Sequence, residues 1–373
     1  SRIQNFVAQM VTNELSSKLQ TKVSVGSVEY RFFNSVKIND LYIEDLQHDT
    51  LLYVDQTKAH FNLRQFINGK IIVNTLEFKN LYGNLKADTL GHTNFEFVIK
   101  AFESPKKDST STLEYKIGRL KIVNSRLSFS RQNGMASKSP EILNPDSLRI
   151  SALNTEIELH LLAKDTLSAE LKSLSFREKS GFVVDRISTE LQASNRGARL
   201  AFLDLKLPVS HLAMSDIVVK YDSITDLKDF VHKVKLTAPI NKSEITFRDF
   251  SAFIPELKDF NKKISINGLI EGRISSLHFK KIGINYGKSM SLNADIDLSG
   301  LPNIYETFIY AKINELKADK ADIQDFVSGL TKKPFLLPKE LNQLGTVNYK
   351  GNISGFLSNL VAYGNLKTNM GSI

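Results

Sequence analysis

The residues that could carry out chemistry are present in this sequence, but they do not form a catalytic or metal-binding pattern. The histidines show neither the H-x-H nor the H-E-x-x-H spacing that is typical of metal sites. There are seven: His48, His60, His92, His160, His211, His232 and His278. No cysteine is present, which excludes a thiol nucleophile, a zinc ribbon and a disulfide framework. The sequence therefore predicts a protein that is not an enzyme and needs no metal or cofactor.

Two motifs resemble reactive sites but lie in the wrong context. The run Gly283-Ile-Asn-Tyr-Gly287-Lys288-Ser289 resembles a phosphate-binding loop, yet it has three residues between its glycines where the motif needs four. It also connects two predicted strands, so no helix N-terminus follows it to hold phosphate. We interpret it as a turn. Asp295 and Asp297 alternate with apolar residues on a predicted strand, and two neighbouring carboxylates alone do not make a glycosidase.

The dominant pattern is structural, because apolar residues recur as pairs two apart that are separated by steps of three. Val36 and Ile38, for example, are followed by Leu41 and Ile43. Alternation with period two predicts a strand with one apolar face, and a step of three would turn the next pair to the other face. A β-bulge restores the phase and bends the strand. Bulges are predicted where these steps fall: Gly26-Ser27, Asn39-Asp40, Asn74-Thr75 and Gly118-Arg119.

This pattern predicts a mainly β fold: an elongated, twisted antiparallel sheet that keeps one apolar face and curls into a groove. A second sheet could cover that face and give a sandwich, and a lipid acyl chain could cover it equally well. The residues predicted to line the groove are Val23, Val25, Val28, Val36, Ile38, Leu41, Ile43, Ile71, Val73, Leu76, Phe78, Ile117, Leu120, Ile122, Leu127 and Phe129.

Charge and length limit the function classes. The net charge is +9, but the lysines and arginines are spread over polar strand positions such as Lys70, Lys79 and Lys116. A solvated sheet face explains that spread better than a nucleic-acid site does, and attraction to anionic lipid headgroups is the lesser alternative. No apolar run is long enough to span a membrane. Because the chain starts with Ser1, we expect a fragment or a processed product.

Three segments are predicted along the chain. Residues 1–20 form an amphipathic helix, which either caps a hydrophobic core or continues from a membrane anchor and closes one end of the sheet. Residues 21–222 form the first β segment, and 223–373 a second segment with a few short helices, across a soft boundary. Within the second segment, residues 268–277 match 351–360 at an offset of 83, with a shared G-x-x-x-G. This repeat favours an elongated, repeat-built sheet.

The N-terminal part resembles a known family. Residues Asn5–Leu15, Leu19 and Thr21–Val28, followed by Phe32–Asp45 and Asp49–Tyr53, are similar to the start of the AsmA-like superfamily. The match is best to the N-terminal portion of TamB-type proteins, particularly those of Bacteroidetes-like bacteria. The repeat with Gly268 and Gly272 is similar to G-x-x-x-G elements of AsmA-like chains, which makes 223–373 an AsmA-like repeat segment.

The resemblance implies a periplasmic protein that is anchored in the inner membrane and reaches toward the outer membrane. It implies a long β-groove that carries phospholipid by its acyl chains, and a partner that is a BamA/TamA-like outer-membrane barrel. No nucleic acid is expected. The anchor that should precede Ser1 and the C-terminal region expected after Ile373 lie outside this sequence, so the chain is predicted to be the N-terminal portion of a longer protein.

Two alternatives to lipid transport stay open. One is an envelope scaffold that binds a barrel protein by adding a strand at an exposed sheet edge. The other is a β-solenoid adhesin or glycan-binding protein, which clustered aromatic and Asp or Asn residues on the outer face would favour. Bound lipid would distinguish transport from both.

Six sites have Asp followed by Ser or Thr and then by Leu, Ile or Thr. They begin at Asp49, Asp88, Asp108, Asp146, Asp165 and Asp222. The pattern resembles the acceptor sequence of the general periplasmic O-glycosylation system of Bacteroidetes, although Asp-Ser and Asp-Thr are also ordinary turn formers. The candidate acceptors, predicted at exposed strand ends, are Thr50, Thr89, Ser147, Thr166 and Ser223.

Overall fold

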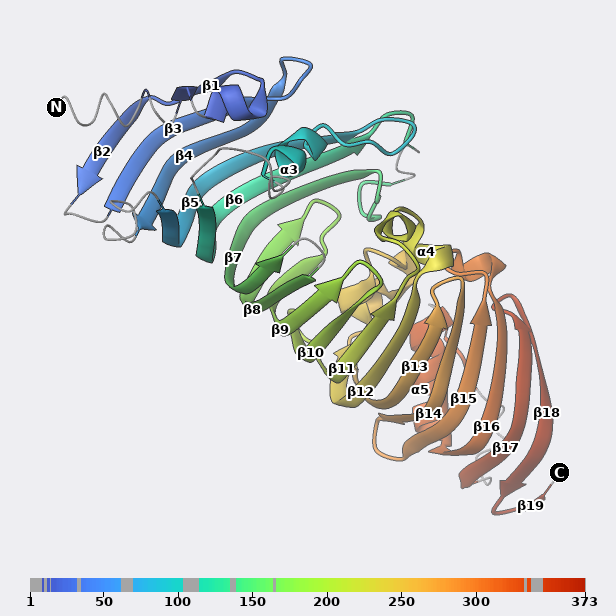
Figure 1. Cartoon of the computed structure of the whole chain (residues 1–373). Coiled ribbons are helices and arrows are strands. Elements are labelled where there is room, and N and C mark those ends of the chain that lie inside the picture. Colours follow the sequence, from blue (N-terminus) through green and yellow to red (C-terminus); the bar gives the residue numbers. More distant parts are fainter. Residues whose placement is uncertain are drawn as a thin grey trace. The chain divides into compact units, whose positions relative to one another are not determined.

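The computed structural model describes residues 9, 12–13, 15–31, 35–61, 70–102, 114–134, 139–163, 166–331, 334–336 and 345–372 (Figure 1). In this part of the chain the fold is mainly β, as predicted, with nineteen strands in a long sheet that does not close and a few short helices. The residues divide into two compact units, 1–188 and 189–373. The predicted boundary between 222 and 223 lies inside the second unit.

The first unit contains eight complete strands, the start of a ninth and one bounded helix. They are β1 (Val23–Ser24), β2 (Ser27–Arg31), β3 (Ser35–Glu44), β4 (Thr50–Phe61), β5 (Lys70–Ala87), α3 (Glu96–Phe102), β6 (Glu114–Arg131), β7 (Ser147–Ala163), β8 (Thr166–Glu178) and β9 (Val183–Ser194).

The second unit continues with strands and short helices. They are β10 (Gly197–Lys206), β11 (His211–Lys220), η2 (Ile224–Asp229), α4 (Phe230–Lys233), β12 (Lys235–Thr246), η3 (Phe247–Phe250), η4 (Pro255–Asp259), β13 (Lys263–Arg273), β14 (Ser276–Tyr286), β15 (Met290–Ser299), η5 (Ile304–Glu306), β16 (Phe308–Asp319), α5 (Lys320–Thr331), β17 (Thr346–Phe356), β18 (Asn359–Thr368) and β19 (Gly371–Ser372).

One pair of strands departs from the predicted antiparallel order. β5 and β6 run parallel, with Ile71 opposite Tyr115 and Leu76 opposite Leu120. The connection between them contains α3 and returns the chain to the same end of the sheet, as a parallel pair requires. The register has a constant offset of 44, so the matching apolar steps of the two strands lie side by side.

Of the four predicted bulges, the one at Asn74 is an extra residue, and the one at Asp40 is a left-handed residue in an unshifted register. Asn74 is an extra residue, because Val73 pairs with Phe61 whereas Thr75 pairs with His60. Asp40 has a φ of 54°, in the left-handed region that Asn and Asp tolerate better than other side chains. Sequence reasoning missed further left-handed residues in the middle of neighbouring strands, which include Asn80 on β5 and Asn124 on β6.

Hydrogen-bonded polar side chains cross β4 to β7 at these left-handed residues. We call them the polar seam: Asp55, Asn80, Asn124 and Asn154. The Asn80 amide donates to Asp55 at 2.9 Å, and the Asn124 amide donates to Asn80 at 2.9 Å. The Asn154 side chain accepts from the Asn124 backbone N–H, also at 2.9 Å. The Asn154 bond supplies a partner to a backbone N–H where the register of β6 and β7 shifts.

The sequence repeat of the second unit is a structural repeat. β17 lies 83 residues after β13 at both of its ends, and each strand leads into a two-residue hairpin. Gly272 and Gly355 have φ values of 117° and 135°. A Cβ on Gly272 would lie 2.3 Å from the Ser276 carbonyl oxygen, and one on Gly355 would lie 2.2 Å from that of Asn359. The last glycine of each G-x-x-x-G is therefore required by the hairpin.

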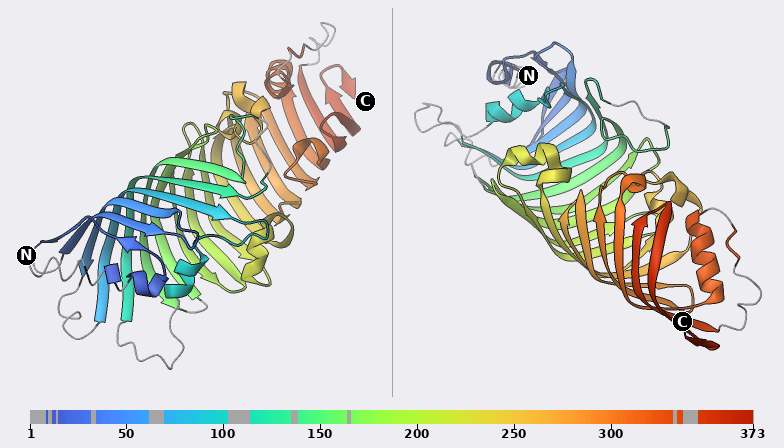
Figure 2. Two further views of the ribbon diagram at one scale, coloured as in Figure 1. Left: turned by 90° about the horizontal axis from the view of Figure 1, so that it is seen from above. Right: turned by 90° about the vertical axis from the view of Figure 1, so that its right-hand side faces the viewer.

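Helical segments cover part of the apolar face in each unit. In the first, residues 15–19 are helical and lie near the α3 helix (Figure 2). Leu19 and residues of α3 pack on the core cluster of β1–β5. The rest of the predicted helix 1–20 lies largely outside the described residues. In the second unit, α5 packs Ile323 and Phe326 against Phe260 and Tyr286. No described helix combines the length and the apolar character needed to cross a membrane.

Candidate functional site

The candidate site is an apolar row that crosses β5 to β8 in the first unit. Leu76 lies opposite Leu120, Leu120 opposite Ile157, and Ile157 opposite Leu171. Direct cross-strand partners share one face of a sheet, and neighbouring strands lie about 4.8 Å apart. All four side chains are half-buried, and none belongs to the packed cores defined among the described residues. We call these residues the apolar row.

The opposite face of the same strands carries paired charges. One position away from the apolar row, Lys58 pairs with Glu77 at 3.3 Å and Lys121 with Glu156 at 3.2 Å. Arg119 adds contacts to Glu156 and Glu158 at 3.6 and 3.7 Å. The two faces of this sheet therefore differ sharply in chemistry. The apolar face is the one that has to be removed from water.

Six of the predicted lining residues are core residues instead of open surface. They are Val23, Val28, Val36, Ile38, Leu41 and Ile43. Leu19 covers them from the N-terminal helical segment and is 2% exposed. Phe97 and Val98 of α3 pack on the same cluster. This end of the apolar face is closed by the protein's own helices.

Nine of the ten remaining predicted lining residues have described side chains. Eight are half-buried: Val25, Val73, Leu76, Phe78, Leu120, Ile122, Leu127 and Phe129. Val25, Phe78 and Leu127 contact the core cluster. Ile117 is 36% exposed. The Ile71 side chain lies outside the described residues, although its backbone pairs with Tyr115.

Sequence reasoning missed Ile157 and Leu171 of the apolar row. Both lie on strands where successive register shifts interrupt the simple alternation, between Glu156 and Ile157 and again between Leu159 and Leu161. Their alignment with Leu120 follows from strand register, which the local pattern does not contain. One sequence signal for this alignment exists. The apolar steps of three fall at equivalent positions in β5 and β6, and this places Leu76 opposite Leu120 at the offset of 44.

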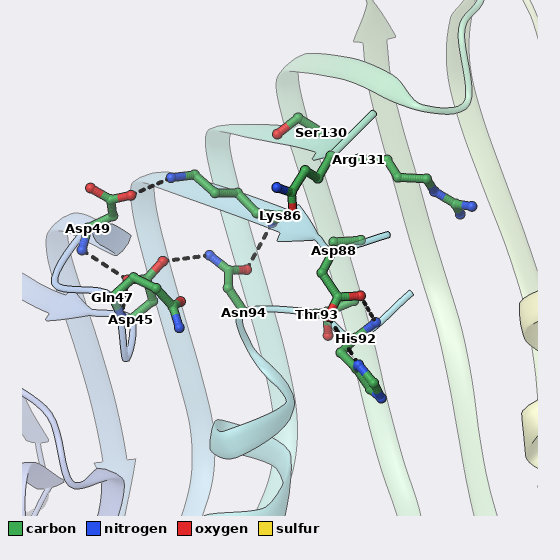
Figure 3. Close-up of a pocket in the computed structure, with 12 residues that line it drawn as sticks. Asp45, Gln47, Asp49, Lys86, Asp88, His92, Thr93, Asn94, Ser130 and Arg131 are labelled. Carbon is green, nitrogen blue, oxygen red and sulfur yellow. Dashed lines mark hydrogen bonds and ion pairs between the residues drawn. The ribbon is translucent and has the colours of Figure 1, made fainter. Parts of the chain in front are cut away.

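A polar pocket of about 530 Å³ lies at the strand ends of the first unit (Figure 3). Lys86 pairs with Asp49 at 2.5 Å, and the Asn94 amide donates to the buried Asp45 carboxylate at 2.9 Å. Asp88 pairs with His92 at 3.1 Å. Although desolvation opposes it, hydrogen bonds from His92 and Leu90 lower the pKa of Asp88. Each of these side chains has a hydrogen-bond or ion-pair partner within the pocket. The described residues contain no cluster able to hold a metal ion.

The turn that resembles a phosphate-binding loop is filled by the protein itself. The Asp322 carboxylate of α5 accepts the backbone N–H groups of Lys288 at 2.9 Å and Ser289 at 2.6 Å, with Met290 at 3.2 Å. It also accepts the Ser289 hydroxyl at 2.8 Å. The loop is a hairpin turn between β14 and β15, as interpreted from its spacing, and Asp322 attaches α5 to it.

The five candidate acceptor hydroxyls lie where strands or helices begin or end. Thr50, Ser147 and Thr166 are the first residues of β4, β7 and β8, Thr89 follows β5, and Ser223 caps η2. All are exposed except Thr50, which is half-buried.

Glycosylation of these hydroxyls stays a prediction. We expect protein purified from its native host to be heavier in intact-mass measurement than the same chain made in a bacterial cytoplasm. Substituting Ser147→Ala and Thr89→Ala together should then reduce the excess. Equal masses from the two sources would contradict it.

No protein-family model, curated protein or solved structure matches this chain.

Proposed function

We propose that this protein binds phospholipid acyl chains along the apolar face of its sheet and carries them through the periplasm between the inner and outer membranes. The observation that supports this is the apolar row, Leu76, Leu120, Ile157 and Leu171, which continues from a core closed by helices. The acyl chain would lie across the strands, and the charged face of the sheet would stay in water. The resemblance to the AsmA-like superfamily supports the same function.

The physical basis is removal of methylene groups from water. Each buried methylene contributes about 0.8 kcal/mol. Roughly fifteen methylenes would give on the order of 10 kcal/mol before ordering losses. Such binding needs a continuous apolar surface and no dedicated polar ligand. That requirement agrees with the mutual pairing of the polar groups around Asp45 and Lys86.

The alternative is a scaffold function, in which a partner protein adds a strand at an exposed edge of the sheet. A BamA/TamA-like barrel and an inner-membrane anchor are part of this proposal. The polar seam does not favour an adhesin, because its Asp and Asn side chains bond to one another.

Lipid mass spectrometry tests the proposal directly. The chain, purified without detergent from a bacterial envelope, should carry phospholipid in at least stoichiometric amount. A periplasmic β protein of similar size, purified in parallel, controls for carry-over. Phospholipid no higher than in that control would contradict lipid binding and leave the scaffold function.

A further inference from the structure

One rim of the second unit carries a row of exposed apolar side chains. This rim consists of the connections that join β11 to β12, β13 to β14, β15 to β16 and β17 to β18, with the strand ends beside them. We call its exposed large side chains the apolar rim: Ile224, Leu227, Phe230, Tyr305, Phe308, Phe356, Leu357 and Leu360. They range from 37% exposed for Phe230 to 58% for Ile224 and Tyr305.

Backbone hydrogen bonds join three of these connections to one another, and the strands that they connect are labelled in Figure 1. The Ser275 backbone N–H donates to the Val231 carbonyl at 3.1 Å, and the Gly300 N–H donates to the Ser275 carbonyl at 2.9 Å. Farther along, Phe308 and Phe356 are cross-strand partners whose ring centroids are 5.6 Å apart. The Ser275 bonds therefore hold three of the four connections together, and the Phe308 and Phe356 rings lie beside the fourth.

The first part of the apolar rim is held by a capped helix. η2 is a 3₁₀ helix, in which side chains three apart lie above one another, so Ile224 and Leu227 align and Phe230 continues the series. Ser223 accepts the Thr225 N–H, and the Asp226 carboxylate accepts the N–H groups at 222 and 223. The apolar stripe is thus presented outward by a well-capped turn.

Several polar groups along the rim are already paired, which lowers the cost of leaving water. Asp226 caps η2 and pairs with Lys233 at 3.6 Å, and Asp229 pairs with His232 at 2.7 Å. The Asn303 side chain accepts the Tyr305 N–H, and the Asn303 backbone carbonyl accepts the Thr307 hydroxyl. The long cationic side chains beside the rim, Lys228, Lys233, Lys235 and Arg273, are exposed. Such side chains can reach headgroups while their aliphatic stems stay near apolar surface.

We propose that the apolar rim docks this protein on a phospholipid bilayer, with its aliphatic and aromatic tips at the boundary between headgroups and acyl chains. An interfacial site needs only apolar tips, paired backbone groups and flanking cations, which this rim has. The docking goes beyond acyl-chain binding in the first unit and does not require it.

Vesicle flotation tests this proposal on the full chain, with vesicles of phosphatidylcholine alone and with added phosphatidylglycerol. The triple variant Ile224→Ser, Leu227→Ser and Phe230→Ser should bind both kinds of vesicle at least roughly tenfold more weakly than the parent chain. The matched control is Leu46→Ser with Leu90→Ser, which removes two exposed leucines of the first unit and should change binding by less than about twofold. Circular dichroism and phospholipid content should be unchanged in both variants.

Three outcomes would overturn the docking. The triple variant could bind vesicles as the parent does, or the control could lose binding equally. The parent chain could also ignore vesicles and instead form a dimer, seen by analytical ultracentrifugation, that the triple variant lacks. Loss of co-purified phospholipid in the parent would contradict the acyl-chain proposal but not the docking, so the two fail separately.

Discussion

Replacing Leu120 with Asp is expected to abolish acyl-chain binding while the chain keeps its β-sheet content. Leu120 is the centre of the apolar row, between Leu76 and Ile157, and is half-buried. In the lipid-free protein an Asp there keeps contact with water. Under a bound acyl chain the carboxylate would be desolvated without a partner, which costs at least several kcal/mol and corresponds to a loss of more than about a hundredfold in affinity.

The measurement is lipid mass spectrometry of purified Leu120→Asp, alongside circular dichroism and urea unfolding. Leu76→Asp should behave alike. The matched control is Leu41→Asp, because Leu41 has the same side chain but lies 6% exposed in the helix-covered core. Leu41→Asp should lower the free energy of unfolding by about 4 kcal/mol or more. If Leu120→Asp and Leu76→Asp unfold the protein as Leu41→Asp does, the apolar row is a close-packed core and the groove proposal is wrong.

The sequence predicts much of this sheet because alternation and its interruptions are local. A strand with one apolar face needs every second side chain on that face, and one extra residue needs one compensating irregularity. Asn74 shows this directly, because it is an extra residue at a step of three. Asp40, at another such step, has a left-handed backbone in an unshifted register. The hairpin glycines of the repeat, Gly272 and Gly355, are predictable for the same reason.

What the sequence does not show depends on contacts between distant segments. The parallel β5–β6 pair follows from the path of the connection through α3, which no local alternation encodes. The coverage of Val36 and Ile38 by Leu19 and α3 likewise depends on tertiary packing. A period-two pattern shows that a face is apolar. It does not show whether protein or ligand covers that face.

The Asp322 carboxylate holds helix α5 against the turn between β14 and β15. Desolvation by burial opposes ionisation, but the N–H groups of Ser289, Lys288 and Met290 and the Ser289 hydroxyl together lower the pKa of Asp322 below its ordinary 3.8. A carboxyl whose pKa is lower in the folded state stabilises the fold above its unfolded pKa. That contribution is lost as the pH falls through the folded value. The attachment of α5 should therefore be complete near neutral pH and weaken in acid below pH 3.8.

The substitution Asp322→Asn is accordingly expected to lower the free energy of unfolding by about 2–3 kcal/mol near neutral pH, because an amide replaces an acceptor of four donors. Urea unfolding near neutral pH and below pH 3.8 measures the effect, and the difference between parent and variant should shrink in acid. Hydrogen exchange should locate the loss of protection in α5 and in the turn at Lys288 and Ser289. The matched control is Asp297→Asn, which breaks an exposed pair with His278 and should cost less than about 1 kcal/mol. If both variants are equally stable near neutral pH, or if the difference does not depend on pH, Asp322 does not hold α5 in place.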